Sequence, residues 1–201
     1  MNHLDAVTAV IVTRGDVDLQ PVIDSLIFPN VVIWNNSEEA TDEMTYGRVL
    51  GARLAPTDVI YSQDDDITHS PENQRALVNA YEPGHMVGCM WDEWSAGAKK
   101  QGIDNGYDDL VFPGSGTITN RVIWEQAISA YLVDYELDDF FRLWCDTLIG
   151  TIAPTLALDL RFDELPHADN DNRMSHLPDG VKNKTEAIRR GREIRRKLKA
   201  V

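Results

Sequence analysis

The chain has 201 residues, 43% of them hydrophobic, which suits one folded globular domain with at most a small appendage. It contains 33 acidic and 19 basic residues, for a formal net charge of −14. No apolar run approaches the roughly 18 residues of a membrane span, and the N-terminal sequence Met-Asn-His-Leu-Asp lacks the basic and apolar regions of a signal peptide. We therefore expect a cytoplasmic protein with no membrane partner.

The N-terminal segment predicts a strand, a helix and a second strand. The continuous apolar and β-branched run Ala6–Thr13 is typical of a buried strand. A short helix is expected over Val17–Leu26, with Asp16 or Asp18 as its cap. The second strand is expected over Val31–Trp34.

The same alternation continues with two more helices and a third strand. Thr41 is expected to cap a helix that runs to about Leu54, and Val59–Ser62 is expected to form the third strand. Ser-Pro-Glu at 70–72 is a good start for a helix that would run to Tyr81, because it supplies a cap, a proline and an acid. This β-α-β-α-β-α order predicts an α/β fold with a mostly parallel central sheet and helices on both faces.

The second half of the sequence is less regular. An exposed loop is expected over residues 163–183, which are rich in Asp, Asn and Pro. The other expected elements are strands at Met86–Trp91, Thr117–Thr119 and Thr155–Leu160 and helices at Arg121–Tyr131, Leu137–Ile149 and Thr185–Lys199. We predict one domain over residues 1–183, followed by a basic C-terminal helix over residues 184–201.

Two cysteines, Cys89 and Cys145, lie far apart in apolar segments. Free cysteine behaves as a small hydrophobic residue and is commonly buried. We expect both side chains to be buried, reduced thiols.

Charge is distributed unevenly along the chain. From Lys182 onward there are nine Lys or Arg and two Glu, a net charge of +7, which leaves −21 for the rest. An acidic body repels nucleic acid at long range. The basic segment could still attract an anion such as diphosphate, an acidic surface or a nucleic acid backbone.

Three consecutive carboxylates, Asp64, Asp65 and Asp66, follow the third predicted strand. Like charges this close repel one another unless a cation or a donor-rich ligand compensates them. In an open α/β sheet, ligands bind beyond the carboxyl ends of the strands. Carboxylates at this position suit a hard divalent cation together with a phosphorylated substrate.

Polar residues also follow the first two strands, at Thr13-Arg14 and at Asn35-Asn36. Because the carboxyl ends of parallel strands meet at one sheet edge, we expect these side chains to lie beside the three acids. Their donors and acceptors suit a base and a ribose, and Arg14 adds a cation near phosphate.

The order of these segments resembles a GT-A glycosyltransferase, particularly the exostosin-like family 64 catalytic domain and more loosely the family 2 enzymes. The resemblance rests on Val10–Thr13, Val31–Asn36, Asp64–Asp66, Pro113–Gly116 and Leu137–Phe140. These segments span most of residues 6–145 in the order of the family. A triple Asp alone is a weak signal, whereas the ordered set is fairly specific.

The resemblance implies where a nucleotide sugar binds. Thr13, Arg14 and Asn35 would line the pocket for the nucleotide base, and Arg48 would support the base or the phosphates. Ribose and the donor sugar would be contacted by Asp64, Asp65 and the backbone around Gly114 and Ser115.

It also implies a metal site and a reaction centre. Asp66 would bind Mn²⁺ or Mg²⁺ through the diphosphate, with His176 as a candidate second ligand. Asp138 or Asp139 would face the reacting sugar and the acceptor hydroxyl. The C-terminal part matches the family poorly, and the candidates there for the phosphates are Arg173, Lys182, Lys184 and Arg189.

The sequence therefore predicts a metal-dependent glycosyltransferase that uses a nucleoside-diphosphate sugar, with uridine diphosphate as the expected carrier. The acceptor would be a hydroxyl on a protein, a small molecule or a modified DNA base. Retention and inversion of the anomeric centre both stay open. The alternatives are a nucleotidyltransferase and a non-catalytic module that binds a sugar nucleotide or a metal.

Overall fold

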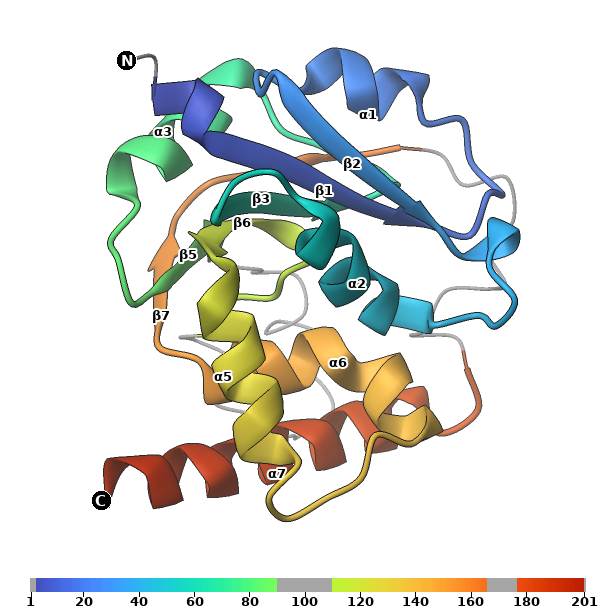
Figure 1. Cartoon of the computed structure of the whole chain (residues 1–201), viewed down its shortest axis with the longest axis vertical. Helices are drawn as coiled ribbons and strands as arrows, with labels where there is room; N and C mark the ends of the chain where they lie inside the picture. The colour runs from blue at the N-terminus through green and yellow to red at the C-terminus, as the bar shows by residue number, and fades with distance from the viewer. Residues whose placement is uncertain (1–2, 90–109, 166–176, 201) are drawn as a thin grey trace.

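The computed structural model describes residues 3–89, 110–165 and 177–200. Its centre is a six-stranded sheet with the strand order β2-β1-β3-β6-β5-β7 (Figure 1). A separate two-stranded sheet pairs β4 with β8. The strands are β1 (Val7–Thr13), β2 (Asn30–Asn35), β3 (Val59–Asp64), β4 (Ile67–Thr68), β5 (Met86–Cys89), β6 (Ser115–Asn120), β7 (Thr155–Leu158) and β8 (Asp163–Glu164).

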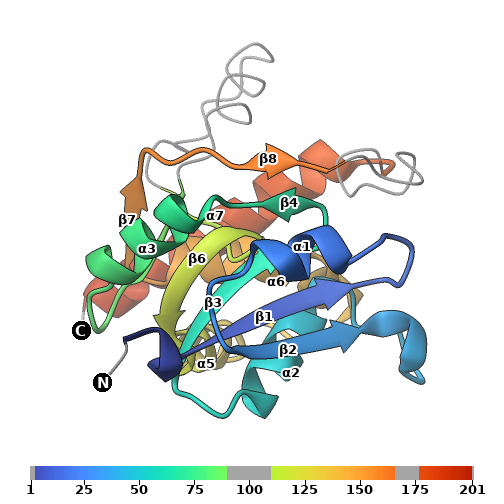
Figure 2. The same cartoon turned by 90° about the horizontal axis from the view of Figure 1, so that it is seen from above.

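Helices cover both faces of the large sheet (Figures 1 and 2). One face is covered by α2, α5 and α6, with α7 packed outside α6, and the other is covered by α1 and α3. The helices are α1 (Gln20–Ser25), α2 (Gly47–Leu54), α3 (Pro71–Ala80), α5 (Arg121–Tyr131), α6 (Asp139–Ile152) and α7 (Gly180–Lys199), and short 3₁₀ turns lie at His3–Ala6, Asn36–Glu38 and Met44–Tyr46.

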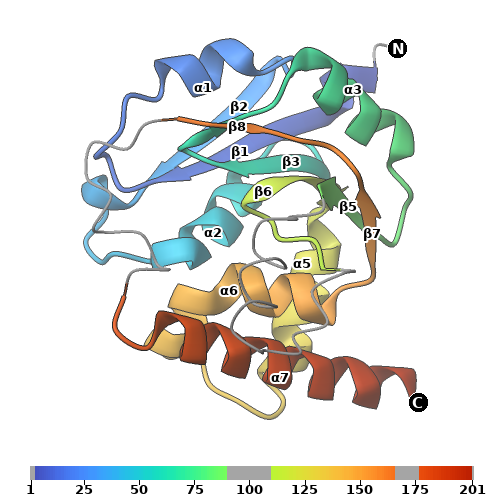
Figure 3. The ribbon, with the colours of Figure 1, turned by 180° about the vertical axis from the view of Figure 1, so that it is seen from behind.

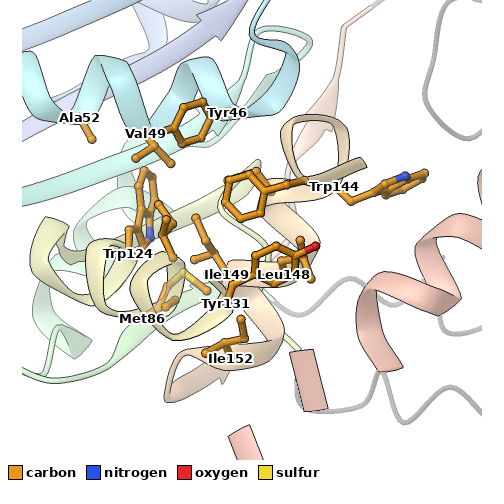
Figure 4. Packing of buried hydrophobic residues seen from close by; sticks show 14 of the residues in the cluster. Tyr46, Val49, Ala52, Met86, Trp124, Tyr131, Trp144, Leu148, Ile149 and Ile152 are labelled. Carbon is orange, nitrogen blue, oxygen red and sulfur yellow. The ribbon is translucent and has the colours of Figure 1, made fainter. Parts of the chain in front are cut away.

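The pleat of β1 divides its apolar residues between two cores. Val10 faces a large core built with α2, α5 and α6, whereas Val7 and Ala9 face a smaller core beneath α3. Figure 4 shows Trp124 of α5 lying beneath Val49 of α2 in the larger core. Burial on both faces explains why the strand reads as a continuous apolar run.

The predicted α/β fold is confirmed. Strand β1 pairs in parallel with β2 and β3, and β5 pairs in parallel with β7, while β6 runs antiparallel to both of its neighbours. Helix α5 has the predicted bounds, and α3 begins after Ser70, whose Oγ accepts a hydrogen bond from the backbone N–H of Asn73 at 3.2 Å.

The predicted start of α2 at Thr41 is wrong, because the helix begins at Gly47. The buried Asn36 ties the preceding segment down: its Oδ1 accepts a hydrogen bond from the Trp34 indole at 3.0 Å, and its Nδ2 donates to the carbonyl of Met44 at 3.0 Å. Met44 has a φ of 53°, which a helix cannot contain. These side-chain bonds outweigh the local helix-start signal at Thr41.

The C-terminal helix begins at Gly180, earlier than predicted, and packs along α6. Ala187, Ile188 and Ile194 are buried, and a Cβ at Gly191 would lie 2.6 Å from the Thr151 side chain. The helix is therefore anchored to the domain by apolar contacts.

Both cysteines are free and buried, as predicted. In the described ranges, no helix has the length and apolar character needed to cross a membrane.

Candidate functional site at the carboxyl edge of the sheet

The three parallel strands end side by side. In the sheet register Thr13 is opposite Asn35, and Val12 is opposite Asp64. The segments that follow β1, β2 and β3 therefore meet at one edge, which can be followed in Figure 2. This juxtaposition is the one expected from the sequence for Thr13, Asn35 and the three acids.

Asp64, the last residue of β3, is fixed by a glycine on the facing chain. Its backbone N–H donates to the carbonyl of Gly114 at 2.8 Å. A Cβ at Gly114 would lie 2.5 Å from a carboxylate oxygen of Asp64, so only glycine fits. The neighbouring Ser115 is 1% exposed, so its side chain cannot present a hydroxyl at the surface. Gly114 lies against Asp64 and is buried like Ser115, and contact of this segment with a donor sugar stays a prediction.

Arg48, on α2, is the centre of a buried charged cluster. It is 1% exposed and forms ion pairs with Asp64 and, at 3.1 Å, with Asp146 of α6. The same guanidinium donates to the Ser62 hydroxyl at 3.0 Å and to the Gln63 carbonyl at 2.8 Å. Arg48 therefore holds Asp64 from below and has no exposed surface for a base or a phosphate.

Lys184 completes this charged cluster of Arg48, Asp64, Asp146 and Lys184. It is buried in α7, with its ammonium 4.8 Å from the centre of the Phe112 ring. Burial lowers the pKa of Lys184 to about 8, whereas the negative charges of Asp64 and Asp146 raise it. Two cations thus face two carboxylates, and the cluster joins β3, α2, α6 and α7.

The pKa values of the cluster reflect burial and pairing. Burial alone would lower the pKa of Arg48, but the carboxylates of Asp146 and Asp64 raise it, so the guanidinium stays charged. Burial raises the pKa of Asp146, and the neighbouring guanidinium of Arg48 opposes that shift. Asp64 is the most exposed member, with 38% of its side chain exposed against 11% for Asp146.

Asp65 lies in the most negative part of the site. Burial raises its pKa to about 6, a hydrogen bond with Thr13 lowers it, and the charges of Asp64, Asp66 and Asp16 raise it further. Ionising Asp65 therefore adds negative charge where three carboxylates already gather. A bound cation would relieve this repulsion.

Arg14 and Asn35 are engaged by their own loops. Arg14 pairs with Asp16 at 3.0 Å. The Oδ1 of Asn35 accepts hydrogen bonds from the N–H and hydroxyl of Ser37, at 3.1 and 2.8 Å, and its Nδ2 donates to Glu38 at 2.8 Å. These side chains lie at the predicted edge, and a ligand there would compete with these local bonds.

Asp138 and Asp139 lie at the start of α6 and have structural partners. Asp138 caps the helix, accepting a hydrogen bond from the backbone N–H of Phe141 at 2.8 Å. Asp139 is 87% exposed and pairs with Arg142 at 3.2 Å. Asp138 and the buried Asp146 are eight residues apart along α6, which corresponds to a rise of about 12 Å.

The acid on α6 that reaches the triple Asp is Asp146, which the sequence analysis did not single out. Its signal was a single carboxylate within an apolar helix, in the run Leu-Trp-Cys-Asp-Thr-Leu-Ile. A buried acid in such a run requires a buried cation, and Arg48 supplies it.

His176 and Arg173 lie outside the described residues. Within the described ranges, no group of three or more His, Cys, Asp or Glu side chains is arranged to hold a metal ion. A cation at this edge would therefore need further ligand oxygens from a bound substrate or from water.

No protein-family model matches the sequence, and no curated protein matches it.

Proposed function

We propose that this protein is a metal-dependent GT-A glycosyltransferase, which transfers a sugar from a nucleoside-diphosphate sugar, with uridine diphosphate as the expected carrier, to an acceptor hydroxyl. The observation that carries the proposal is the meeting of Asp64–Asp66 with Thr13 and Asn35 at the carboxyl ends of three parallel strands. This edge is where open α/β sheets bind nucleotides.

The acids at this edge fit a cation that is shared with a phosphate ligand. The raised pKa of Asp65, to about 6, reflects burial and surplus negative charge from its neighbours. Asp66 would hold Mn²⁺ or Mg²⁺ with the diphosphate oxygens, since the described residues offer no complete set of protein ligands. The ion, when bound, supplies Lewis-acid stabilisation of the leaving diphosphate.

The side chains of the edge would divide the recognition of the donor. Asn35 would contact the base and ribose, and Asp65, which the buried Thr13 supports through a hydrogen bond, would accept hydrogen bonds from sugar hydroxyls. Asp64, locked by Arg48 and Gly114, would form a fixed wall of the pocket. Rigid placement of such groups keeps the reacting atoms aligned.

In the transfer, the bond between the anomeric carbon and the diphosphate oxygen breaks and a bond from that carbon to the acceptor oxygen forms. The acceptor proton passes to a carboxylate, and the nucleoside diphosphate leaves. Asp138 and Asp139 stay the proposed carboxylates, because both are exposed at the start of α6. Retention and inversion are both compatible with this arrangement.

A second candidate is a non-catalytic module that binds a sugar nucleotide. It is favoured by the structural partners of Asp138 and Asp139, since the helix cap and the pair with Arg142 account for both acids without chemistry. This candidate expects donor binding at the same edge without turnover or hydrolysis.

A thermal-shift panel of nucleoside-diphosphate sugars, with and without Mn²⁺, tests the proposal. We expect one donor to raise the melting temperature only when Mn²⁺ is present, and this shift to vanish in Asp66→Ala. The matched control is Glu82→Ala, which removes an exposed acid from the turn before β5 and should keep the shift. A donor shift of equal size without metal, or in Asp66→Ala, would count against the site.

A further inference from the structure

Helix α7 presents a basic face to solvent. Its exposed residues include five cations and no acid, namely Lys182, Thr185, Arg189, Arg196, Lys197, Leu198 and Lys199. Lys182, Arg189 and Arg196 recur every seven residues, so they lie on one side of the helix at steps of about 10 Å. Figure 1 shows α7 on the outside of the molecule, with α6 between it and the sheet.

The two acids of α7 form ion pairs with cations of the same helix. Glu186 pairs with Arg189 at 2.7 Å and with Arg190 at 2.9 Å, and Glu193 pairs with Arg189 at 3.2 Å and with Lys197 at 3.6 Å. Within the described part of the chain, Lys182, Arg196 and Lys199 form no ion pair. Their charge is available to a ligand.

We propose that this basic face, centred on Lys182, Arg196 and Lys199, binds the phosphate backbone of a nucleic acid. A row of exposed cations on a rigid helix is sufficient for backbone binding, which depends on phosphate neutralisation and counterion release. The rest of the chain carries −21 and repels a nucleic acid at long range, so the net positive α7 segment favours its approach.

The other polyanionic partners fit this face less well. A helix that inserts into a membrane interface needs an exposed apolar face, but the apolar side of α7 is buried against α6, with Ala187, Ile188 and Ile194 inside. A protein interface needs aromatic or aliphatic anchors, and Leu198 is the exposed apolar residue that α7 offers.

The proposed binding of a nucleic acid by α7 does not depend on sugar transfer. Only the further step, in which the bound nucleic acid carries the acceptor hydroxyl, rests on the proposed function. Lys184 links the two surfaces, because it lies in the first turns of α7 and contributes to the charged cluster beneath Asp64. A nucleic acid on α7 is therefore held on the helix that borders the candidate site.

Fluorescence anisotropy with labelled oligonucleotides, in the absence of any sugar donor, tests the proposal. The arms are duplex DNA, single-stranded DNA and RNA of equal length, measured from 50 to 200 mM salt. Each cation lost should reduce the slope of log affinity against log salt by about 1. The triple variant Lys182→Gln, Arg196→Gln, Lys199→Gln should lose about 3 in slope and on the order of 100-fold in affinity at 0.1 M salt.

The matched control removes three cations elsewhere, in Arg53→Gln, Arg75→Gln, Arg121→Gln on α2, α3 and α5. It changes net charge equally and should bind like the wild type. Wild-type binding to any of the three nucleic acids that is lost only in the α7 variant supports the proposal. No binding at 50 mM salt, equal loss in both variants, or equal affinity for polyglutamate of matched charge would overturn it. If a sugar donor still raises the melting temperature of a protein that binds no nucleic acid, the proposed glycosyltransferase function is not contradicted.

Discussion

Two buried polar clusters lie on opposite faces of β3, and they differ in charge and in access to solvent. The charged cluster of Arg48, Asp64, Asp146 and Lys184 lies on the α2 and α6 side and opens to solvent through Asp64. The histidine cluster of Tyr61, Gln63, His69 and Cys89 lies on the other side and is closed.

The histidine cluster is neutral. The Nε2 of His69 lies 3.1 Å from the Ser115 carbonyl oxygen, and its Nδ1 lies 3.8 Å from the Cys89 sulfur. Burial lowers the pKa of His69 to about 4, although the Ser115 carbonyl raises it, and burial raises the pKa of Cys89 to about 12. A cysteine and a histidine in contact therefore make no thiolate here.

The contrast separates a structural polar cluster from a candidate site. Both contain pKa values shifted by burial, so a shifted pKa alone does not mark function. The charged cluster differs because one of its members, Asp64, is exposed beside two further acids. The predictions below test this difference, from the largest expected effect to the smallest.

Replacing Arg48 with Met should give the largest loss of stability. The change leaves the buried Asp146 without its guanidinium partner and should cost about 3–5 kcal/mol. Chemical denaturation measures the loss. The control is Arg53→Met, which breaks an exposed pair with Glu125 and should cost at most about 1 kcal/mol. Similar losses in the two variants would show that the charged cluster is not coupled as described.

Gly116→Ala should disturb the histidine cluster. Gly116 has a φ of 85°, and an added Cβ would lie 2.2 Å from His69 Nε2. Gly84 is a matched control, because its φ is 91° and nothing lies within 4 Å of an added Cβ. Both variants should lose about 1 kcal/mol or more to backbone strain. Gly116→Ala should lose roughly 1–3 kcal/mol in addition, from overpacking against His69.

Denaturation with urea compares Gly116→Ala and Gly84→Ala directly. An equal loss in the two would mean that His69 moves aside without cost, and the histidine cluster would then be loosely packed.

Burial of neutral His69 should lower stability as the pH drops from 8 to 5, whereas the raised pKa values of Asp65 and Asp146 act in the opposite sense. The folded pKa of His69, about 4, lies below the ordinary value of 6.5, so below pH 6.5 the unfolded chain takes up a proton that the folded chain does not. The stabilisation is complete above pH 6.5 and is lost as the pH falls toward 4. At pH 5 the loss should be about 2 kcal/mol.

The variant His69→Gln isolates this effect, since other groups also titrate in the range. Relative to this variant, the wild type should lose about 2 kcal/mol of stability between pH 8 and 5. Identical pH dependence in the two proteins would rule out a neutral buried His69.

Substitution of Asp138 should have the smallest effect on stability, and it separates a role as helix cap from a role in sugar transfer. Asp138→Ala removes the cap of α6 and should cost about 1 kcal/mol. Asp138→Asn keeps a good cap and should leave stability near that of the wild type. If Asp138 also accepts the proton in sugar transfer, the Asn variant should lose turnover while it keeps donor binding. Full turnover in Asp138→Asn would leave Asp138 as a cap only.

Much of the fold could be predicted because local signals agree with the final structure. The apolar run of β1, the cap at Ser70 and the bounds of α5 all followed from short-range patterns. The start of α2 could not, because the bonds of Asn36 to Trp34 and Met44 depend on contacts that a helix-start signal does not contain.

The candidate site was predicted in part for a similar reason. The meeting of Thr13, Asn35 and Asp64 follows from parallel pairing, which the β-α-β order predicts. The partners of Arg48 were missed because Asp64, on β3, and Asp146, on α6, lie 16 and 98 residues from it in the sequence and meet it only in the folded chain. Long-range charge pairing of this kind has no signature in a single sequence.

The central claim is that the acids after β3 bind a nucleoside-diphosphate sugar through a divalent cation. Isothermal titration of the donor selected by thermal shift, with Mn²⁺ and with a chelator, tests it most directly in the wild type, Asp66→Ala and Glu82→Ala. The account predicts donor binding that needs Mn²⁺, disappears in Asp66→Ala and persists in Glu82→Ala. Unchanged donor affinity in Asp66→Ala, or equal affinity with the chelator, would contradict it.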